Sequence, residues 1–202
     1  MRKTRIKFCG LKRIEDIKAA NELMPDFAGF VFWEKSSRNV SGDDAKKLGQ
    51  ALLPEIKKVG VFVDEEPEKV AALLKDKVID IAQLHGSEDE GYIARLRELS
   101  GGAPIIKAFV VKSREDLERA KESSADYLLL DSGKGTGQTF NWELIKEAGF
   151  DKPFFLAGGL GVENVAKAQK VLHPFAVDVS SGIETNGVKD PEKMRQFMGE
   201  IL

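Results

Sequence analysis

The sequence predicts an α/β protein with the fold of a single-domain (β/α)8 TIM barrel, and three observations lead to this prediction. Eight short apolar runs recur along the 202 residues, and polar segments with helical spacing separate them. Each strand–helix unit takes about 25 residues, close to the minimum for strand, loop, helix and loop. Strict alternation indicates a parallel sheet. An open doubly wound sheet is the alternative, but eight units favour the closed barrel.

The strand candidates are four to eight residues long and rich in Val, Ile and Phe, as buried strands are. They cover residues 5–9, 27–32, 58–63, 79–85, 104–110, 126–131, 153–159 and 175–181.

Helical spacing is clearest in Glu15–Leu23, Pro67–Lys75, Asp89–Leu99 and Arg114–Ser123. Pro67 suits a first helical turn, and Ser113 with Asp116 has the capping-box pattern. Residues 1–202 contain no linker, low-complexity tract or charge block, so we expect one domain.

Composition excludes several classes of function. Lys plus Arg number 31 against 33 Asp plus Glu, which argues against a basic surface for nucleic acid or anionic membrane. The single cysteine cannot form an intrachain disulfide and suits a reducing compartment. No apolar run approaches the roughly 18 residues of a membrane span, and the first residues lack a signal-peptide apolar region. We expect a cytoplasmic protein.

Alternation along the strands predicts which side chains face the barrel interior. In the last strand Phe175, Val177 and Val179 suit the helix layer, so Ala176, Asp178 and Ser180 face inward.

The same alternation places Lys7 with Cys9 and Gln83 with His85 inside the barrel. Polar inward residues gather at the carboxyl ends of the strands, where barrel active sites form. Lys7 and Asp178 lie on adjacent strands, and buried charges of opposite sign need pairing, so we expect an ion pair just below the site.

Cys9 and Asp131 are the candidate catalytic residues, at the ends of the first and sixth strands. A thiol can act as a base where nearby cations favour the thiolate, and a carboxyl group opposite it can act as an acid. A buried structural cysteine and a loop-capping aspartate are the alternatives.

Two turns predict a phosphate site, because the loops after strands seven and eight commonly bind phosphate in this fold. The first turn contains Gly158 and Gly159, and the second contains Ser180, Ser181 and Gly182.

Arg38, in the loop after the second strand, is a candidate for binding a carboxylate, with a solvated surface charge as the alternative. His85 and Asp178 are candidates for substrate contact, whereas His173 is expected in a loop. Two histidines without a Cys/His/Asp cluster argue against a metal site. Neither GxGxxG nor GxxxxGK[ST] occurs, so no nucleotide cofactor is expected.

Several motifs together resemble the phosphoribosylanthranilate isomerase family of tryptophan biosynthesis. They are KFCGLK, GFVFWEKSSRNV, VGVFVDE, QLHG, LLLDSGKGTGQTFNW, AGGLGVENV and FAVDVSSGIETNGVKD, in the family's order from about residue 5 onward. The departures are Phe8 where Ile is common, Trp33 where Tyr is common, and a compact loop after Asp131.

The resemblance implies an Amadori rearrangement of N-(5-phosphoribosyl)anthranilate with Asp131 as general acid, Cys9 as general base and no cofactor. Arg38 would hold the anthranilate carboxylate and the two glycine turns the phosphate. The rivals are indole-glycerol-phosphate synthase, ribulose-phosphate epimerase and a non-catalytic sensor barrel. The sequence leaves open whether the chain is a monomer or a homodimer. It also leaves open a second activity on the histidine-pathway aminoaldose.

Overall fold

Eight parallel strands form the centre of the molecule. In the computed structural model, which describes residues 4–131 and 142–201, each strand lies within a predicted apolar run or extends one residue beyond it. Their bounds are β1 (Arg5–Cys9), β2 (Phe27–Val31), β3 (Lys57–Phe62), β4 (Ile81–Leu84), β5 (Ile105–Val110), β6 (Tyr127–Asp131), β7 (Phe154–Ala157) and β8 (Ala176–Val179).

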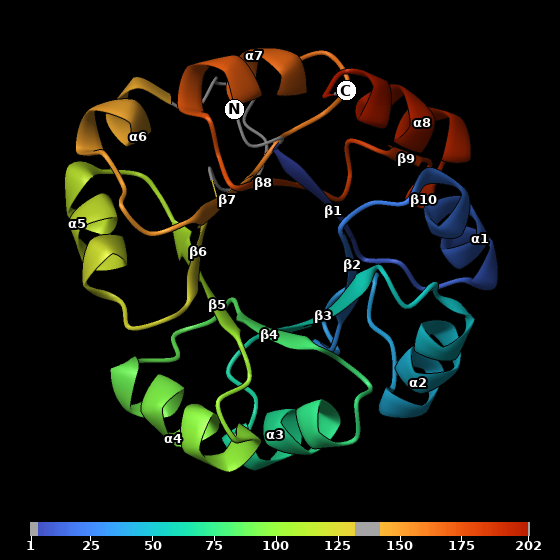
Figure 1. Cartoon of the computed structure of the whole chain (residues 1–202), viewed down its shortest axis with the longest axis horizontal. Coiled ribbons are helices and arrows are strands. Elements are labelled where there is room, and N and C mark those ends of the chain that lie inside the picture. Colours follow the sequence, from blue (N-terminus) through green and yellow to red (C-terminus); the bar gives the residue numbers. More distant parts are fainter. Residues whose placement is uncertain (1–3, 132–141, 202) are drawn as a thin grey trace.

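The strands close into a barrel in the order β1 to β8, because β1 pairs in parallel with both β2 and β8. Figure 1 shows the closed ring of strands surrounded by the helices. Closure confirms the predicted (β/α)8 fold over the open sheet. The compact loop predicted after Asp131 falls on residues 132–141, which lie outside the described residues.

The helices follow the strands around the ring, and their first turns carry the expected caps. In α5, Ser113 Oγ accepts from the backbone N–H of Asp116, which confirms the predicted capping box. Pro67 occupies the first turn of α3, as predicted. The bounds are α1 (Ile14–Leu23), α2 (Gly42–Ala51), α3 (Pro67–Lys75), α4 (Glu90–Ser100), α5 (Arg114–Glu122), α6 (Trp142–Ala148), α7 (Val165–Leu172) and α8 (Pro191–Gly199).

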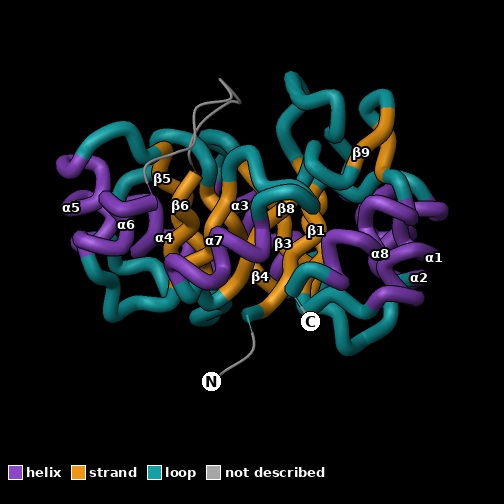
Figure 2. Tube along the Cα trace, turned by 90° about the horizontal axis from the view of Figure 1, so that it is seen from above, coloured by secondary structure: helices purple, strands orange, loops and turns teal. Residues whose placement is uncertain are grey.

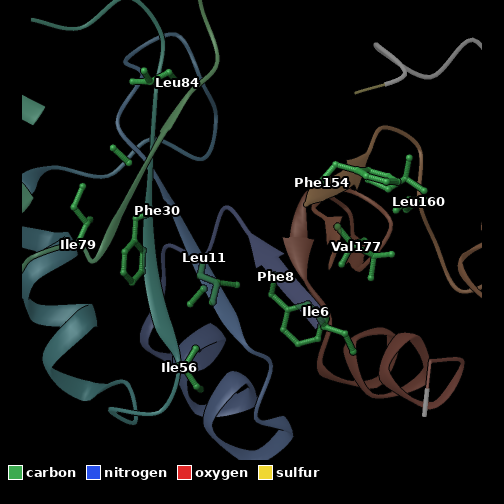
Figure 3. Close-up of a cluster of buried hydrophobic side chains, with 14 of the residues drawn as sticks. Ile6, Phe8, Leu11, Phe30, Ile56, Ile79, Leu84, Phe154, Leu160 and Val177 are labelled. Atoms are coloured by element: carbon green, nitrogen blue, oxygen red, sulfur yellow. The ribbon is translucent and has the colours of Figure 1, made fainter. Parts of the chain in front are cut away.

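The larger hydrophobic core lies between the strands and the helices. Ile6, Phe8 and Val177 point into this layer, where Figure 3 shows them with other buried side chains. The ring of Phe8 packs edge-on against Phe197 of α8, with 6.5 Å between the ring centroids. Helices cover the strands on the outside, and apolar side chains pack inside the barrel. Each strand is therefore a nearly continuous apolar run.

A smaller apolar cluster fills the barrel interior and closes its amino-terminal end. Phe27, Tyr127 and Phe155 contribute their rings to this cluster. Phe175 joins them, with its ring centroid 5.6 Å from that of Phe155. The prediction that Phe175 faces the helices is therefore wrong. It precedes β8, so strand alternation does not fix the direction of its side chain, and the ring caps the barrel instead. Val177 confirms the alternation.

A short hairpin after β8 was not predicted. Its strands are β9 (Glu184–Thr185) and β10 (Val188–Lys189), which pair in antiparallel fashion. Asn186 and Gly187 join them with positive φ angles of 53° and 76°. This is the geometry of a tight two-residue turn that Asn-Gly adopts readily. Figure 2 shows β9 above the barrel strands.

Candidate active site

A cavity of about 510 Å³ lies over the carboxyl ends of the barrel strands. Most of the predicted site residues line it: Cys9, Arg38, His85, Asp131, Gly158, Gly159, Asp178, Ser180 and Ser181. Gly182 is not part of this lining. A Cβ atom there would lie 2.0 Å from the carbonyl oxygen of Leu160, so glycine is required by the close approach of two loops.

Cys9 lies at the end of β1, with 9% of its surface exposed. A Cβ atom on Gly29 of the neighbouring strand would come within 3.0 Å of the Cys9 Sγ, so that glycine gives the thiol its room. Burial raises the pKa of the Cys9 thiol, while the nearby Lys7 and Lys189 ammonium groups lower it without cancelling the rise. The cations favour the thiolate as expected, but the net pKa lies above the ordinary value.

Below the thiol, Lys7 and Asp178 form the predicted ion pair. The Lys7 Nζ lies 3.0 Å from the Asp178 Oδ2, and register pairs the two residues across β1 and β8. The Lys7 side chain is fully buried, and its Nζ also donates to the Gln83 Oε1 at 2.7 Å. Burial acts to lower the pKa of Lys7, but Asp178 and Cys9 together outweigh it and the net pKa is raised. Lys7 is therefore held as a cation inside the barrel.

On the other side of the cavity, His85 and Asp131 lie close together. The His85 Nε2 is 3.4 Å from the Asp131 Oδ2, and the opposite ring nitrogen, Nδ1, is 3.1 Å from the Gln83 Nε2. His85 follows β4 and Asp131 ends β6, so the barrel brings together two residues that are far apart in sequence. The strand pattern indicated that both belong at the mouth, and the structure adds their direct contact.

Arg38 lies at the rim of the cavity and is held by Glu184 of β9. The Arg38 Nε and Nη2 donate to the two carboxylate oxygens of Glu184 at 2.7 and 2.6 Å, a bidentate pair. Gly10 makes room for it, because a Cβ atom there would lie 2.4 Å from the Arg38 Cδ. Lys189 donates to Glu184 at 2.6 Å and to the backbone oxygen of Ser180 at 3.0 Å. Arg38 is thus an anchored side chain and not a solvated surface charge.

The Glu184 carboxylate predicts a measurable acid dependence of stability. Burial opposes its ionisation, but Arg38 and Lys189 outweigh this effect and lower its pKa from 4.5 to about 2. A depressed carboxyl pKa stabilises the fold above the unfolded value, and this contribution is lost as pH falls toward 2. We expect Glu184→Gln to flatten the pH dependence of the unfolding free energy between these values. An unchanged slope in denaturant titrations would contradict the assigned ion pairs.

The turn after β7 has the backbone that only glycine adopts easily. Gly158 and Gly159 have φ angles of 89° and 63°. The turn lies beside the one after β8, because Gly161 and Gly182 form an isolated bridge. On the other side, the Ser180 Oγ donates to the backbone oxygen of Cys9 at 3.1 Å. The two predicted phosphate turns therefore border one end of the cavity.

The other residues singled out in the sequence, His173, Phe8 and Trp33, are not among the described residues that line the cavity. His173 is the C-cap residue just after α7, with a φ of 46°. Phe8 packs in the helix layer, and Trp33 is 38% exposed. Within residues 4–131 and 142–201, no group of His, Cys, Asp and Glu is arranged to hold a metal ion. In the same parts of the chain, no helix has the length and apolar character needed to cross a membrane.

Comparison with known proteins decides the family of the chain. The family model for N-(5'-phosphoribosyl)anthranilate isomerase matches residues 6–200. The chain belongs to the phosphoribosylanthranilate isomerase family. It is therefore an isomerase of tryptophan biosynthesis, and the expected family, fold and activity are confirmed.

Individual relatives agree over nearly the whole length. An N-(5'-phosphoribosyl)anthranilate isomerase of Clostridium acetobutylicum is 46% identical, over 98% of this chain and 97% of the relative. The isomerase solved with reduced 1-(o-carboxyphenylamino)-1-deoxyribulose 5-phosphate has a TM-score of 0.84 and 38% identity, over 98% of both chains. A dimeric isomerase of Thermotoga maritima, solved as monomers, has a TM-score of 0.82 and 36% identity, over 98% of both chains.

Sequence reasoning missed several polar residues of the isomerase cavity and its rim, namely Ser36 and Gln83 in the lining and Glu184 and Lys189 at the rim. Glu184 and Lys189 belong to the hairpin, and the dipeptide Asn186-Gly187 is the signal that could have indicated it. Gln83 was placed inside the barrel by alternation but had no assigned part. Its contacts with Lys7 and His85 link the two sides of the site.

Proposed function

We propose that the cavity isomerises N-(5'-phosphoribosyl)anthranilate by general acid–base catalysis, with Asp131 as the acid and Cys9 as the base. One observation carries these roles: both side chains line the same cavity from different sides of the barrel. A proton has to be given at one atom of the substrate and taken from another, so two such groups facing one ligand suit the reaction.

The steps balance with these two groups alone. Asp131 gives its proton to the ribose ring oxygen, and the bond between this oxygen and C1 breaks to leave an iminium ion. Cys9, as thiolate, removes the proton from C2, and the electron pair of that C–H bond moves into the iminium. The resulting enolamine tautomerises to the ketone as its hydroxyl proton is lost and C1 gains a proton, and transfer of the proton from the Cys9 thiol to the Asp131 carboxylate through water restores both groups. The positive iminium nitrogen is the electron sink at which the developing charge is neutralised.

Arg38 fits the proposed role of binding the anthranilate carboxylate. Glu184 takes the guanidinium edge made by Nε and Nη2. The edge made by the two Nη atoms can then donate to a second planar carboxylate, which is the geometry that arginine favours. Because Glu184 and Gly10 fix the side chain, the clamp is already oriented before substrate binds.

Asp178 is proposed to bind a substrate hydroxyl group. Its Oδ2 is paired with Lys7, while its Oδ1 is buried and has no hydrogen-bond partner in the described parts of the chain. Asp178 lines the cavity. A buried carboxylate oxygen without a donor is costly, and a hydroxyl of the bound ribose would supply one.

The phosphate group of the substrate is proposed to bind between the turns after β7 and β8. The support is the pair of left-handed glycines at Gly158 and Gly159, together with Ser181 of the neighbouring turn, which lines the same cavity. Inorganic phosphate is then expected to inhibit competitively, raising KM at unchanged kcat. Gly159→Pro should remove most of this inhibition, because proline takes away one N–H donor and does not tolerate this φ. Non-competitive inhibition, or an anion bound only elsewhere, would contradict the site.

A turnover assay tests the proposed function. The natively folded chain is expected to convert fluorescent N-(5'-phosphoribosyl)anthranilate to the aminoketone, measured by loss of fluorescence. Binding without turnover would instead favour a sensor barrel.

We also propose that residues 1–202 act as one barrel domain on this small phosphorylated substrate, in the cytoplasm, as monomer or homodimer. The Thermotoga maritima relative supports the dimer. Sedimentation of the purified chain decides between the two oligomeric states.

A further inference from the structure

A continuous row of polar side chains crosses the barrel at the floor of the cavity, and four of its five members line that cavity. Asp178 contacts Lys7 at 3.0 Å, Lys7 contacts Gln83 at 2.7 Å, and Gln83 contacts His85 at 3.1 Å. His85 contacts Asp131 at 3.4 Å. The row therefore connects the cation beside the proposed base with the proposed acid.

The direction of the hydrogen bonds in this row follows from the donors and acceptors each group possesses. An ammonium group can only donate, so the Gln83 group that faces the Lys7 Nζ has to be the carbonyl oxygen. The amide nitrogen of Gln83, which can only donate, then faces the His85 Nδ1. The Nδ1 atom has to accept, and a neutral imidazole that accepts at Nδ1 carries its proton on Nε2.

The Gln83 amide is held in this orientation. Gln83 is 1% exposed and the Lys7 side chain is fully buried, so water cannot replace either partner readily. Turning the amide over would place its N–H groups against the Lys7 ammonium and its oxygen against the His85 Nδ1. The buried contact with Lys7 would lose its hydrogen bond and set N–H groups against an ammonium group, whichever tautomer His85 adopts, and that cost fixes the orientation.

We propose that Gln83 is a positioning residue that holds His85 in the Nε2–H tautomer, so that this N–H faces Asp131. The inference rests on the proposed role of Asp131 as the general acid. When Asp131 gives its proton to the ribose ring oxygen, it becomes a carboxylate. The His85 N–H then donates to that carboxylate and stabilises it, while His85 keeps its own proton throughout. Gln83 is assigned no substrate contact and acts through the imidazole of His85.

The tautomer is measured directly by the 15N chemical shifts of the imidazole nitrogens. The chain has two histidines, so His173 provides an internal reference, and a His173→Gln variant assigns the signals. The wild-type protein is expected to show a protonated Nε2 and an unprotonated Nδ1 at His85. In Gln83→Glu the carboxylate can only accept, so Nδ1 becomes protonated. This variant keeps an acceptor for Lys7 and is therefore the one chosen to preserve folding.

Kinetics of the same variants supply the second measurement. Gln83→Glu and Gln83→Met are expected to lower kcat by roughly 10- to 100-fold, by analogy with the loss caused by removing partners that orient metal-binding histidines. KM should change by less than about threefold, since Gln83 makes no proposed substrate contact. The His173→Gln variant should keep the wild-type kcat.

Two results would overturn the inference: a protonated Nδ1 at His85 in the wild type, or a folded Gln83→Glu variant with unchanged nitrogen shifts and kcat. Failure of the proposed function gives a different result. The wild-type shifts would then agree with the Nε2–H tautomer, but the chain would not convert N-(5'-phosphoribosyl)anthranilate.

Discussion

Replacing Cys9 by alanine, or Asp131 by asparagine, is expected to lower kcat by ~10²–10⁴-fold with little change in KM. Both groups transfer protons in the transition state. Their loss therefore raises the free energy of the transition state but not that of the bound substrate, so kcat falls while KM stays nearly constant. Asparagine keeps the shape of Asp131 but has no acidic proton to give. Stopped-flow or steady-state loss of substrate fluorescence measures the effect under conditions where chemistry limits the rate.

The matched control is Asp126→Asn, which makes the same chemical change just before the start of β6, at the opposite end of the barrel. Asp126 accepts from the backbone N–H of Ile105 and contacts Arg97, away from the cavity. The Asp126→Asn variant should lower the stability of the fold and leave kcat unchanged. A near-normal kcat in either Cys9→Ala or Asp131→Asn would show that the role of that residue is assigned wrongly.

The raised pKa of Cys9 gives the same prediction a pH dependence. Because burial raises this pKa above its ordinary value, the thiol form predominates at neutral pH in the empty site. The reactive form carries the Cys9 thiolate and the protonated Asp131 carboxyl together, so the pH profile of kcat/KM of the wild type should be limited by two pKa values, one of them that of Cys9. The residual activity of Cys9→Ala should lack the limit set by Cys9, since that titrating group is gone.

The barrel could be predicted from the sequence because its signals are local and repeated. Val, Ile and Phe runs alternate with capped helical segments, and strand alternation alone places Lys7 and Asp178 on facing positions of adjacent strands. Phe175 shows where this reasoning ends. One residue before β8 the backbone leaves the sheet, and packing against Phe27 and Phe155 decides the direction of the ring.

The site residues that could be predicted are polar groups at the ends of strands. The residues that were missed belong to the site only because of contacts with residues far away in the sequence. Glu184 follows β8 in a segment with no apolar pattern, and its importance comes from meeting Arg38, 146 positions away in the sequence. The sequence also does not reveal whether the pKa of Cys9 is raised or lowered. The direction depends on whether burial outweighs the nearby cations, and that balance requires the depth of the thiol as well as its neighbours.

Replacing Lys7 by methionine is expected to destabilise the fold by roughly 3–5 kcal/mol, because it leaves the Asp178 carboxylate buried and unpaired. Asp178 is 8% exposed and already has one oxygen without a partner. Without Lys7 its other oxygen would lose the 3.0 Å contact as well. Urea denaturation of both proteins at one pH measures the difference. The double variant Lys7→Met/Asp178→Leu should recover most of the loss, since it removes both charges.

The same substitution should raise the pKa of the Cys9 thiol further. Burial already raises this pKa, and Lys7 contributes the largest opposing effect, ahead of Lys189. Removing the Lys7 cation leaves burial less opposed, so a larger fraction of Cys9 stays protonated at a given pH. Thiolate absorbance near 240 nm during a pH titration gives the Cys9 pKa in the folded variant, and Lys189→Met provides a comparison with a smaller expected shift.

A Cys9 pKa identical in wild type and folded Lys7→Met would exclude the electrostatic link. Destabilisation alone would then leave Lys7 a purely structural role.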